Sequence, residues 1–332
     1  MTKYFFLSRG VAQFCQASHL AVMQYTAKIG QNLIPSDWQD YQLVDSGHGR
    51  KLERFGRFHF VRPEMQALWE PRQPQSLWDA ADGVFLASAD DSEQGGKWQL
   101  KPHVPDSWEL GFETVRFAAM PTPFRHLGFF PEQSVHWQWC AEQITAFIKI
   151  HNRPPRILNL FAYSGVASLH AAAAGAEVTH LDASKKAVAQ AFANRDLSGL
   201  PDAPIRFITD DAIRFVEREA RRERSYDGII LDPPKYGRGP KGEVWQLSRD
   251  LPKLLTGCRA ILSETPLFLV ATLYAIRTST VAVHSAIASH LQGLDGTLTS
   301  GEIAIAEDGE EGRAIGQALY VRYSGLPPDF AG

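Results

Sequence analysis

The second half of the chain alternates short apolar segments with helix-forming ones, and this alternation restricts the fold more than any other feature. Aliphatic and β-branched residues cluster at 156–160, 178–181, 205–209, 226–231 and 267–273, and helical patterns cover 134–150, 165–174, 184–197 and 212–224. Strands that alternate with helices predict a parallel, doubly wound sheet with helices on both faces. Segments 298–306 and 318–323 are two strand patterns with no helix between them, so we expect them to form a C-terminal antiparallel hairpin. The expected fold class is α/β and Rossmann-like, with a mostly parallel sheet of seven strands.

The first part of the chain has a different pattern. From residue 41 to about 117, short β-forming stretches such as 57–62 and 113–117 lie between Gly, Pro and Asp breakers. A chain of 332 residues exceeds the usual domain size of about 100–200 residues. We therefore expect a small β-rich α+β domain over 1–126, which recognises the substrate, and the Rossmann-like domain over 127–332. Within 1–35, only 13–28 has a helix-like pattern.

Charge gives no global attraction to nucleic acid, because the net charge is −3 and the isoelectric point is about 6.4. A local cluster could still follow phosphates. Its members are Arg50, Lys51, Arg54, Arg57 and Arg62. A solvated strand face explains the same run equally well.

The three cysteines, Cys15, Cys140 and Cys258, are far apart and match no metal-ligand spacing, so we expect free thiols and no metal. No apolar run approaches the roughly 20 residues of a membrane helix. The first ten residues lack the long apolar region and cleavage site of a signal peptide. The expected location is the cytoplasm.

The end of the first strand of the sheet is the first candidate ligand site, because open α/β sheets bind ligands at the carboxyl ends of their strands. The loop leads into a helix whose amides face a ligand, and it has one glycine where the dinucleotide fingerprint has three. Its residues are Asn159, Leu160, Phe161, Ala162, Tyr163, Ser164 and Gly165. A plain strand-to-helix turn explains this loop alone equally well.

Acidic residues end the next two strands. Asp182, with the adjoining Ala183 and Ser184, can accept hydrogen bonds from ribose hydroxyls, although an Asp before a helix is often only its cap. Asp211, with the amide of Ala212, can read the amino group and ring nitrogen of adenine, and Asp210 is the competing choice. A loop, a ribose carboxylate and an adenine carboxylate in this order favour an adenosine-containing cofactor.

The fourth strand runs into Asp232, Pro233, Pro234, Lys235 and Tyr236. Consecutive prolines fix an extended backbone, so the Asp232 carboxylate and the Pro233 carbonyl become acceptors for a planar substrate, with Tyr236 as a stacking surface. Lys235, Arg238 and Lys241 offer a second phosphate contact, and the glycine-rich stretch 237–242 can close over a substrate. A rigid turn that only ends a strand is the alternative.

These motifs together resemble the class I S-adenosylmethionine-dependent methyltransferases. Asn-Leu-Phe-Ala-Tyr-Ser-Gly at 159–165, Asp182, Asp211 and Leu-Asp-Pro-Pro-Lys at 231–235 are similar to the large-subunit ribosomal RNA methyltransferases I and K. Segments 43–47, 51–56, 61–64 and 128–133 are similar to the same group. The resemblance implies S-adenosylmethionine as cofactor, with the methionine part at 159–165, ribose at Asp182, adenine at Asp211, and Glu132 and Gln133 nearby. RNA is the partner that it implies.

The chain departs from that family in three ways. Ser134 stands where the related segment carries Arg, and no cysteine follows the fifth strand. We also expect no counterpart of the family's N-terminal PUA-type RNA-binding module, since residues 1–40 are too few to hold one. Carbon-5 of cytosine needs covalent activation by a thiolate, whereas a nitrogen acceptor needs mainly alignment with the methyl group. We therefore expect N-methylation of a nucleobase, with methylation of a protein or small molecule as the alternative. A nicotinamide-dependent oxidoreductase and a non-catalytic RNA-binding module are the rival classes.

Overall fold

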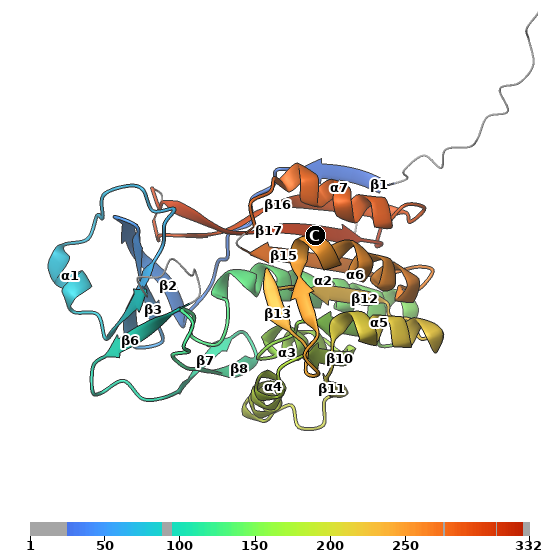
Figure 1. Ribbon diagram of the computed structural model, residues 1–332, viewed down its shortest axis with the longest axis horizontal. Helices are drawn as coiled ribbons and strands as arrows, with labels where there is room; N and C mark the ends of the chain where they lie inside the picture. Colours follow the sequence, from blue (N-terminus) through green and yellow to red (C-terminus); the bar gives the residue numbers. More distant parts are fainter. Residues whose placement is uncertain (1–24, 88–94, 275, 310, 328–332) are drawn as a thin grey trace, which may run out of the picture.

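The computed structural model describes residues 25–87, 95–274, 276–309 and 311–327. They form a large sheet layered with helices and a smaller β-rich part beside it, joined by one long hairpin (Figure 1). The large sheet has the strand order β1-β16-β17-β15-β12-β9-β10-β11. Its strands are β1 (Tyr25–Ile29), β9 (Arg156–Leu160), β10 (Glu177–Asp182), β11 (Ile205–Thr209), β12 (Gly228–Leu231), β15 (Phe268–Tyr274), β16 (Gly296–Ala306) and β17 (Ala314–Ser324).

This sheet confirms the predicted Rossmann-like class and its C-terminal hairpin. Strand β17 runs antiparallel to both neighbours, β15 and β16, and every other pairing in the sheet is parallel. The sheet has eight strands rather than the expected seven, because β1 pairs in parallel with β16. The helix predicted from the pattern at 13–28 is therefore wrong for residues 25–28, which belong to β1. The rest of that segment lies outside the described residues.

Helices cover both faces of the large sheet, which explains why all four residues of β12 are buried. They are α2 (Ser134–His151), α3 (Val166–Ala173), α4 (Lys185–Leu197), α5 (Ala212–Arg221), α6 (Leu247–Ile261) and α7 (Thr280–His290), with a 3-10 turn η1 (Pro131–Gln133) ahead of α2. Side chains alternate between the faces: Ile229 and Leu231 pack with α5, α6 and α7, and Ile230 packs with α2 and α3.

The smaller part contains a five-stranded sheet and a separate β-hairpin. Its elements are β2 (Tyr41–Gly47), β3 (Arg50–Phe55), β4 (Phe58–Pro63), α1 (Gln75–Asp79), β5 (Gly83–Ala87), β6 (Gly96–Leu100), β7 (Trp108–Phe112) and β8 (Val115–Ala119). Its aromatic core includes Phe55, Phe60 and Phe117 and continues into α2 and α3 through Trp137 and Leu169. The two parts therefore share a hydrophobic interface.

The β16–β17 hairpin extends from the large sheet to the small one (Figure 1). Leu298 and Val321 belong to the core beneath α6 and α7, whereas Ile305 and Ile315 belong to the core of the small part. At the tip, Arg313 donates to the Asp45 carboxylate at 2.8 Å. The second expected strand of the hairpin, 318–323, begins earlier than expected, because residues 314–316 pair with β16 and β17 therefore starts at Ala314.

Candidate functional site

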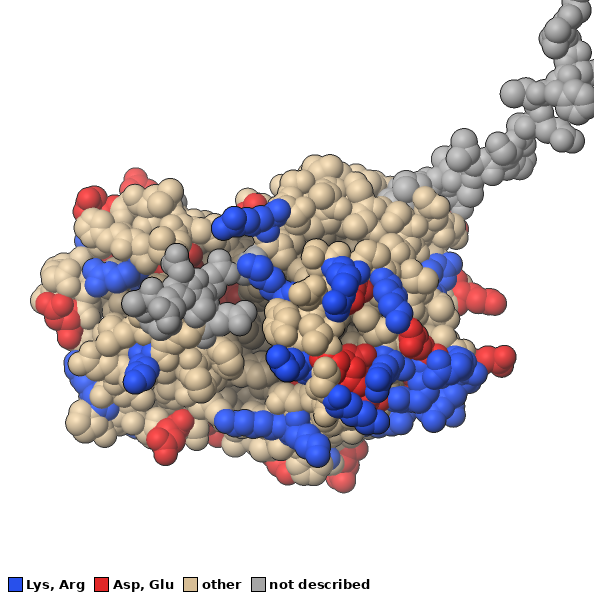
Figure 2. Space-filling view, in the orientation of Figure 1, with Lys and Arg blue, Asp and Glu red and all other residues tan. Residues whose placement is uncertain are grey.

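A cavity of about 820 Å³ opens at the carboxyl ends of β9, β10, β11 and β12. The strand order reverses at β9, since β10 and β11 follow on one side and β12 and β15 on the other. This is the place where an open α/β sheet binds its ligand. The small part and β17 close the opposite side of the cavity, and Figure 2 shows the hollow between the two halves of the molecule.

Most residues predicted for the site line this cavity. They are Glu132, Phe161, Tyr163, Asp182, Ala183, Ser184, Asp211, Ala212, Asp232, Pro233, Pro234 and Lys235. The residues predicted for the site that do not line it are Gln133, Asn159, Ala162, Ser164, Gly165 and Tyr236. The structure therefore brings all four predicted strand-end segments together.

The residues predicted at the end of β9 and in the following loop have two different roles: some fix the turn, and others line the cavity. Asn159 donates to Ser168 Oγ at 3.0 Å, and the Ser164 carbonyl accepts from Asn194 at 2.9 Å. Gly165 has φ +84°, and a Cβ there would lie 2.7 Å from the Ala191 Cβ, so the turn requires glycine. These three positions fix the turn, while Phe161 and Tyr163 line the cavity.

The Asp182 carboxylate at the end of β10 holds the neighbouring loop in place. Its oxygens accept from the Tyr163 amide at 2.9 Å and the Ser184 amide at 2.8 Å. The alternative that Asp182 caps α4 is wrong, because the side chain that caps this helix is Ser184. Burial raises the pKa of Asp182, although its hydrogen bonds from backbone amides oppose that effect.

The two acidic residues after β11, Asp210 and Asp211, make different contacts. Asp210 forms an ion pair with Arg218 at 2.6 Å. Asp211 caps α5 by accepting from the Arg214 amide at 2.9 Å, and among the described residues its second oxygen has no recorded partner. Of the two, Asp211 therefore keeps more capacity to accept from a ligand.

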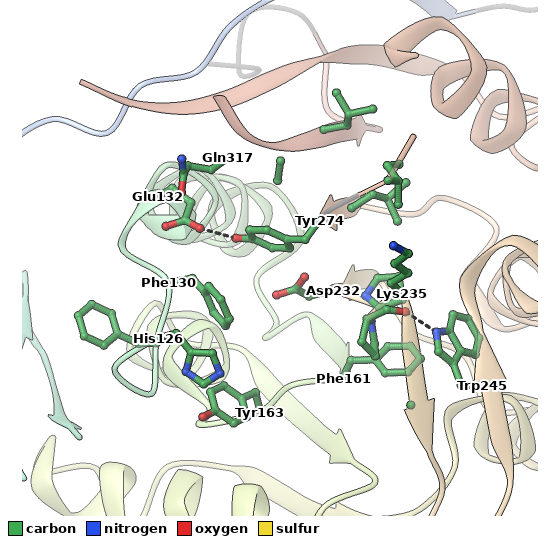
Figure 3. A pocket seen from close by; sticks show the side chains of 18 of the residues that line it. His126, Phe130, Glu132, Phe161, Tyr163, Asp232, Lys235, Trp245, Tyr274 and Gln317 are labelled. Carbon is green, nitrogen blue, oxygen red and sulfur yellow. Dashed lines mark hydrogen bonds between the residues drawn. The ribbon is translucent and has the colours of Figure 1, made fainter. Parts of the chain in front are cut away.

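Asp232 lines the cavity close to Tyr274, whose hydrogen bond to Glu132 is drawn in Figure 3, and Gln133 links these residues into a chain. Gln133 Nε2 donates to Asp232 Oδ2 at 3.2 Å and to Tyr274 Oη at 3.1 Å, and the Tyr274 hydroxyl donates to Glu132 at 2.9 Å. Burial, followed by the nearby charges of Glu132 and Asp182, raises the pKa of Asp232 to about 8. The electrostatic effect of Glu132 and Asp182 on Asp232 means that these three carboxyl groups together favour a positively charged ligand beside them.

Sequence reasoning missed five aromatic residues on the cavity wall, namely His126, Phe129, Phe130, Trp245 and Tyr274. Phe130 lies with ring centroids 5.2 Å from His126 and 5.3 Å from Tyr274. Burial, together with Arg62 and Arg125, lowers the pKa of His126 to about 4, so this imidazole is neutral at pH 7. The position of Tyr274 at the end of β15 is the one signal that could have identified it.

The segment after the paired prolines differs from the expectation. The predicted flexible stretch 237–242 lies largely within a small hairpin of β13 (Tyr236–Arg238) and β14 (Val244–Gln246), which Trp245 fastens by donating to the Pro234 carbonyl at 2.6 Å. Tyr236 is 44% exposed and does not line the cavity, so its role as a stacking surface stays a prediction. The neighbouring Trp245 instead packs on Phe161, with ring centroids 5.0 Å apart.

The basic cluster at 50–62 does not form a phosphate-binding stripe. Lys51 and Arg62 are buried and line the cavity. Arg62 makes two 2.6 Å hydrogen bonds to Glu53. Arg50 lies over the Trp78 ring and Arg57 over that of Phe58. Alternation along the strands thus sends these side chains to different faces.

Two cysteines lie in the described part of the chain, and neither lines the cavity. Cys140 is buried in α2 and Cys258 in α6, and burial raises the pKa of each to about 12. Cys15 lies outside the described residues. Over the same described ranges, we find no cluster of three metal-ligating side chains and no helix long and apolar enough to cross a membrane.

Comparison with known proteins places these features in context. Residues 138–249 match a family described as "Conserved hypothetical protein 95". A crystal structure of a SAM-dependent methyltransferase from Agrobacterium tumefaciens is 44% identical, with a TM-score of 0.86, and the match covers 92% of this chain and 96% of that one.

Two curated relatives are ribosomal RNA large subunit methyltransferases K/L. The one from Pseudoalteromonas translucida is 35% identical over 121 residues, and the one from Hahella chejuensis is 37% identical over 119 residues. These matches cover 36% and 35% of this chain but only 17% and 16% of the relatives. The chain thus matches about a sixth of their length.

Proposed function

The chain belongs to the S-adenosylmethionine-dependent methyltransferases, and from that premise we propose that it methylates a nitrogen atom of a nucleobase in ribosomal RNA. The observation that carries the proposal is the position of Asp232 and Pro233. They end β12 inside the cavity that also contains Asp182 and Asp211. An acceptor base and the cofactor would therefore meet in one enclosed space.

The residues of the cavity suit this cofactor. Asp182 would hold the ribose, and Asp211 with the Ala212 amide would hold the adenine. Phe161, Tyr163 and Glu132 would surround the methionine part. The carboxyl groups of Glu132, Asp182 and Asp232 complement a sulfonium and an ammonium cation. When bound, S-adenosylmethionine supplies an electrophilic methyl group.

The chain's own contribution would be alignment of the acceptor and management of a proton. Gln133 orients the Asp232 carboxylate, which can accept an N–H hydrogen bond from the acceptor base together with the Pro233 carbonyl. Near-attack alignment of this kind is a large source of rate in reactions that need no further activation. A pKa of about 8 also allows Asp232 to hold or release a proton near neutral pH.

We propose a nitrogen atom rather than carbon-5 as the methyl acceptor because of where the cysteines lie. A carbon acceptor needs a thiolate at the cavity, whereas Cys140 and Cys258 are buried in helices and have strongly raised pKa values. The choice of ribosomal RNA rests on the curated relatives. We assign recognition of that RNA to the small part, because its strands β3 and β4 contribute Lys51, Arg62 and Pro63 to the cavity wall. The expected domain bounds of 1–126 do not hold at the start, since β1 belongs to the large sheet.

Nucleoside analysis tests this proposal. Total RNA from a strain that lacks the gene should lose one methylated nucleoside, and purified protein with labelled S-adenosylmethionine should restore it. A label that enters protein or a small molecule instead of RNA would contradict the RNA assignment. Stabilisation by NAD but not by S-adenosylhomocysteine in a thermal-shift assay would contradict the assignment of the cofactor.

A further inference from the structure

The loop between β8 and Phe129 lies at the mouth of the cavity and is held rigidly. Thr122 closes it, since its hydroxyl lies 2.7 Å from the Phe124 carbonyl oxygen and 2.8 Å from the His126 carbonyl oxygen and can donate to either one. The Met120 amide donates to the Leu127 carbonyl at 2.9 Å, and Trp98 donates to the Thr122 carbonyl at 2.7 Å. We call residues 120–127 the rim loop.

A buried ion pair supports the rim loop from below. Arg62 is bound to the fully buried Glu53, and its remaining Nη1 donates to the Arg125 carbonyl at 3.0 Å. Tyr41 donates to the same Glu53 carboxylate at 2.9 Å. Burying charged groups is costly unless each is paired. This arrangement fixes the backbone of the loop and leaves the side chains at its tip exposed.

Two side chains at that tip face solvent. Phe124 is 51% exposed, and its ring is stacked on the neutral His126 with centroids 5.9 Å apart. Arg125 is exposed and lines the cavity, and within the described part of the chain its guanidinium makes no recorded ion pair. An aromatic ring next to an unpaired cation is the combination that binds a single-stranded nucleotide.

The ring of Phe124 also begins a series of aromatic side chains that enters the cavity. From His126 the series continues to Phe130 at 5.2 Å and Tyr163 at 5.6 Å, and from Phe130 to Tyr274 at 5.3 Å. Figure 3 shows His126, Phe130 and Tyr163 grouped on one wall, with Tyr274 beside Asp232. Flat groups can therefore pack continuously from the surface to the proposed acceptor position.

We propose that the rim loop holds the nucleotide next to the acceptor base, with Phe124 stacked on its base and Arg125 bound to its phosphate. This inference rests on the proposed function, because it requires a single-stranded RNA segment at the cavity mouth. The rigid backbone lowers the entropy lost on binding. The rim loop thus supplies contacts to RNA that the strand ends do not.

A second exposed Phe–Arg pair on the surface provides a matched control. Phe192 is 47% exposed on α4, but Arg195 lies over its ring at 3.9 Å and is bound to Asp196 at 2.7 Å. Neither residue lines the cavity. If exposure alone weakened the enzyme on mutation, the Phe192→Ala variant would behave like the Phe124→Ala variant.

Steady-state methyl transfer to total RNA from a strain that lacks the gene tests the inference. Phe124→Ala should raise KM for RNA about tenfold, the scale of losing one base stack, with kcat changed less than twofold. Arg125→Met should raise KM and lower the slope of log affinity against log salt by about 0.7, the share of one phosphate on a single strand. Phe192→Ala and Arg195→Met should leave both unchanged, and S-adenosylhomocysteine affinity should be normal in all four.

The possible results separate the two claims. A wild-type enzyme that transfers no methyl group to RNA contradicts the proposed function. An active wild-type enzyme whose Phe124→Ala and Arg125→Met variants keep the normal KM and salt dependence contradicts the rim-loop inference alone. An equal loss in the Phe192→Ala control would also overturn it, because the effect would then belong to surface aromatics in general.

Discussion

The cavity has two walls that are built in different ways. The strand-end wall carries Asp182, Asp211 and Asp232, which follow neighbouring strands of one sheet. The small-domain wall carries Lys51, Glu64 and Gln317, which bind one another: Lys51 lies 2.9 Å from the Gln317 amide oxygen and 3.3 Å from the Glu64 carboxylate.

The difference suggests a division of labour. In the strand-end wall, Asp211 and Asp232 retain acceptor capacity, so that wall is suited to hold ligands. In the small-domain wall, charges neutralise one another, so that wall sets the shape of the cavity. Substitutions in the first wall should therefore impair activity in a folded enzyme, whereas substitutions in the second should first lower stability.

The largest effect is expected in the small-domain wall. Arg62→Met would remove both 2.6 Å hydrogen bonds to the buried Glu53 and leave it with only the Tyr41 hydroxyl and Lys51 at 3.8 Å, which should cost about 3–5 kcal/mol of unfolding free energy. Burial opposes ionisation of Glu53, but Arg62 and Lys51 outweigh it and lower its pKa. Denaturant unfolding measures the cost, and the double variant Arg62→Met/Glu53→Gln should recover part of it. If the Arg62→Met enzyme had normal stability, the proposed difference between the two walls would be wrong, because substitutions in the small-domain wall are expected to lower stability first.

In the strand-end wall, Asp182→Ala should weaken cofactor binding by about 2–4 kcal/mol, because charge-assisted hydrogen bonds to the ribose are lost. The structure adds a second contribution, since the same carboxylate holds the Tyr163 and Ser184 amides. Asp182→Asn keeps one acceptor oxygen and should lose less. Calorimetry measures the affinity of each variant for S-adenosylhomocysteine. An unchanged affinity in the folded Asp182→Ala variant would refute the assignment of Asp182 to the ribose.

Asp232→Ala should lower kcat by roughly 100-fold or more while cofactor affinity stays within a few-fold, because Asp232 is proposed to align the acceptor. Asp232→Asn should lie between the wild type and the alanine variant. Single-turnover rates, cofactor affinity and melting temperature should be measured on the same preparations. A destabilised alanine variant with a normal single-turnover rate would mean that Asp232 only ends a strand.

The raised pKa of Asp232 gives the strand-end wall a pH dependence. Because this pKa is about 8, Asp232 is mostly protonated at pH 6, and a sulfonium cation favours its ionised form. Affinity for S-adenosylmethionine should therefore rise a few-fold between about pH 6 and about pH 8 and level off above that, the same few-fold effect that loss of the charge in Asp232→Ala should have. S-adenosylhomocysteine has a neutral sulfur and should show a flatter profile, as should Asp232→Asn. Parallel profiles for both ligands in the wild type would exclude this linkage.

The smallest effect is expected for the thiols. If neither wall uses a cysteine, replacing Cys15, Cys140 and Cys258 together should leave turnover nearly intact in a folded protein. Cys140→Ala and Cys258→Ala each remove a buried side chain, so a modest loss of stability is the main expected change. A covalent complex with 5-fluorocytosine RNA that disappears in Cys258→Ala would overturn nitrogen methylation.

The two walls also differ in how far the sequence predicts them. Asp182, Asp211 and Asp232 each follow a local strand pattern, and parallel topology brings such ends to one edge of the sheet. Lys51 on β3 and Gln317 on β17 are 266 residues apart in sequence and belong to different sheets, and they meet only through the tertiary fold. No local pattern encodes that approach. Strand β1 was missed for the same reason, since its pairing with the distant β16 decides its conformation.

The β16–β17 hairpin has a consequence for how this architecture can be inherited or engineered. Its two strands contribute side chains to two hydrophobic cores, with Leu298 and Val321 in one and Ile305 and Ile315 in the other. The small part, β2 to β8, lies in sequence between β1 and the other strands of the large sheet, yet it completes its interior with residues from the end of the chain. A chimera that exchanges residues 1–126 between homologues would therefore bring together mismatched packing partners. The unit that can be exchanged is discontinuous: the small domain together with the hairpin tip, 303–317.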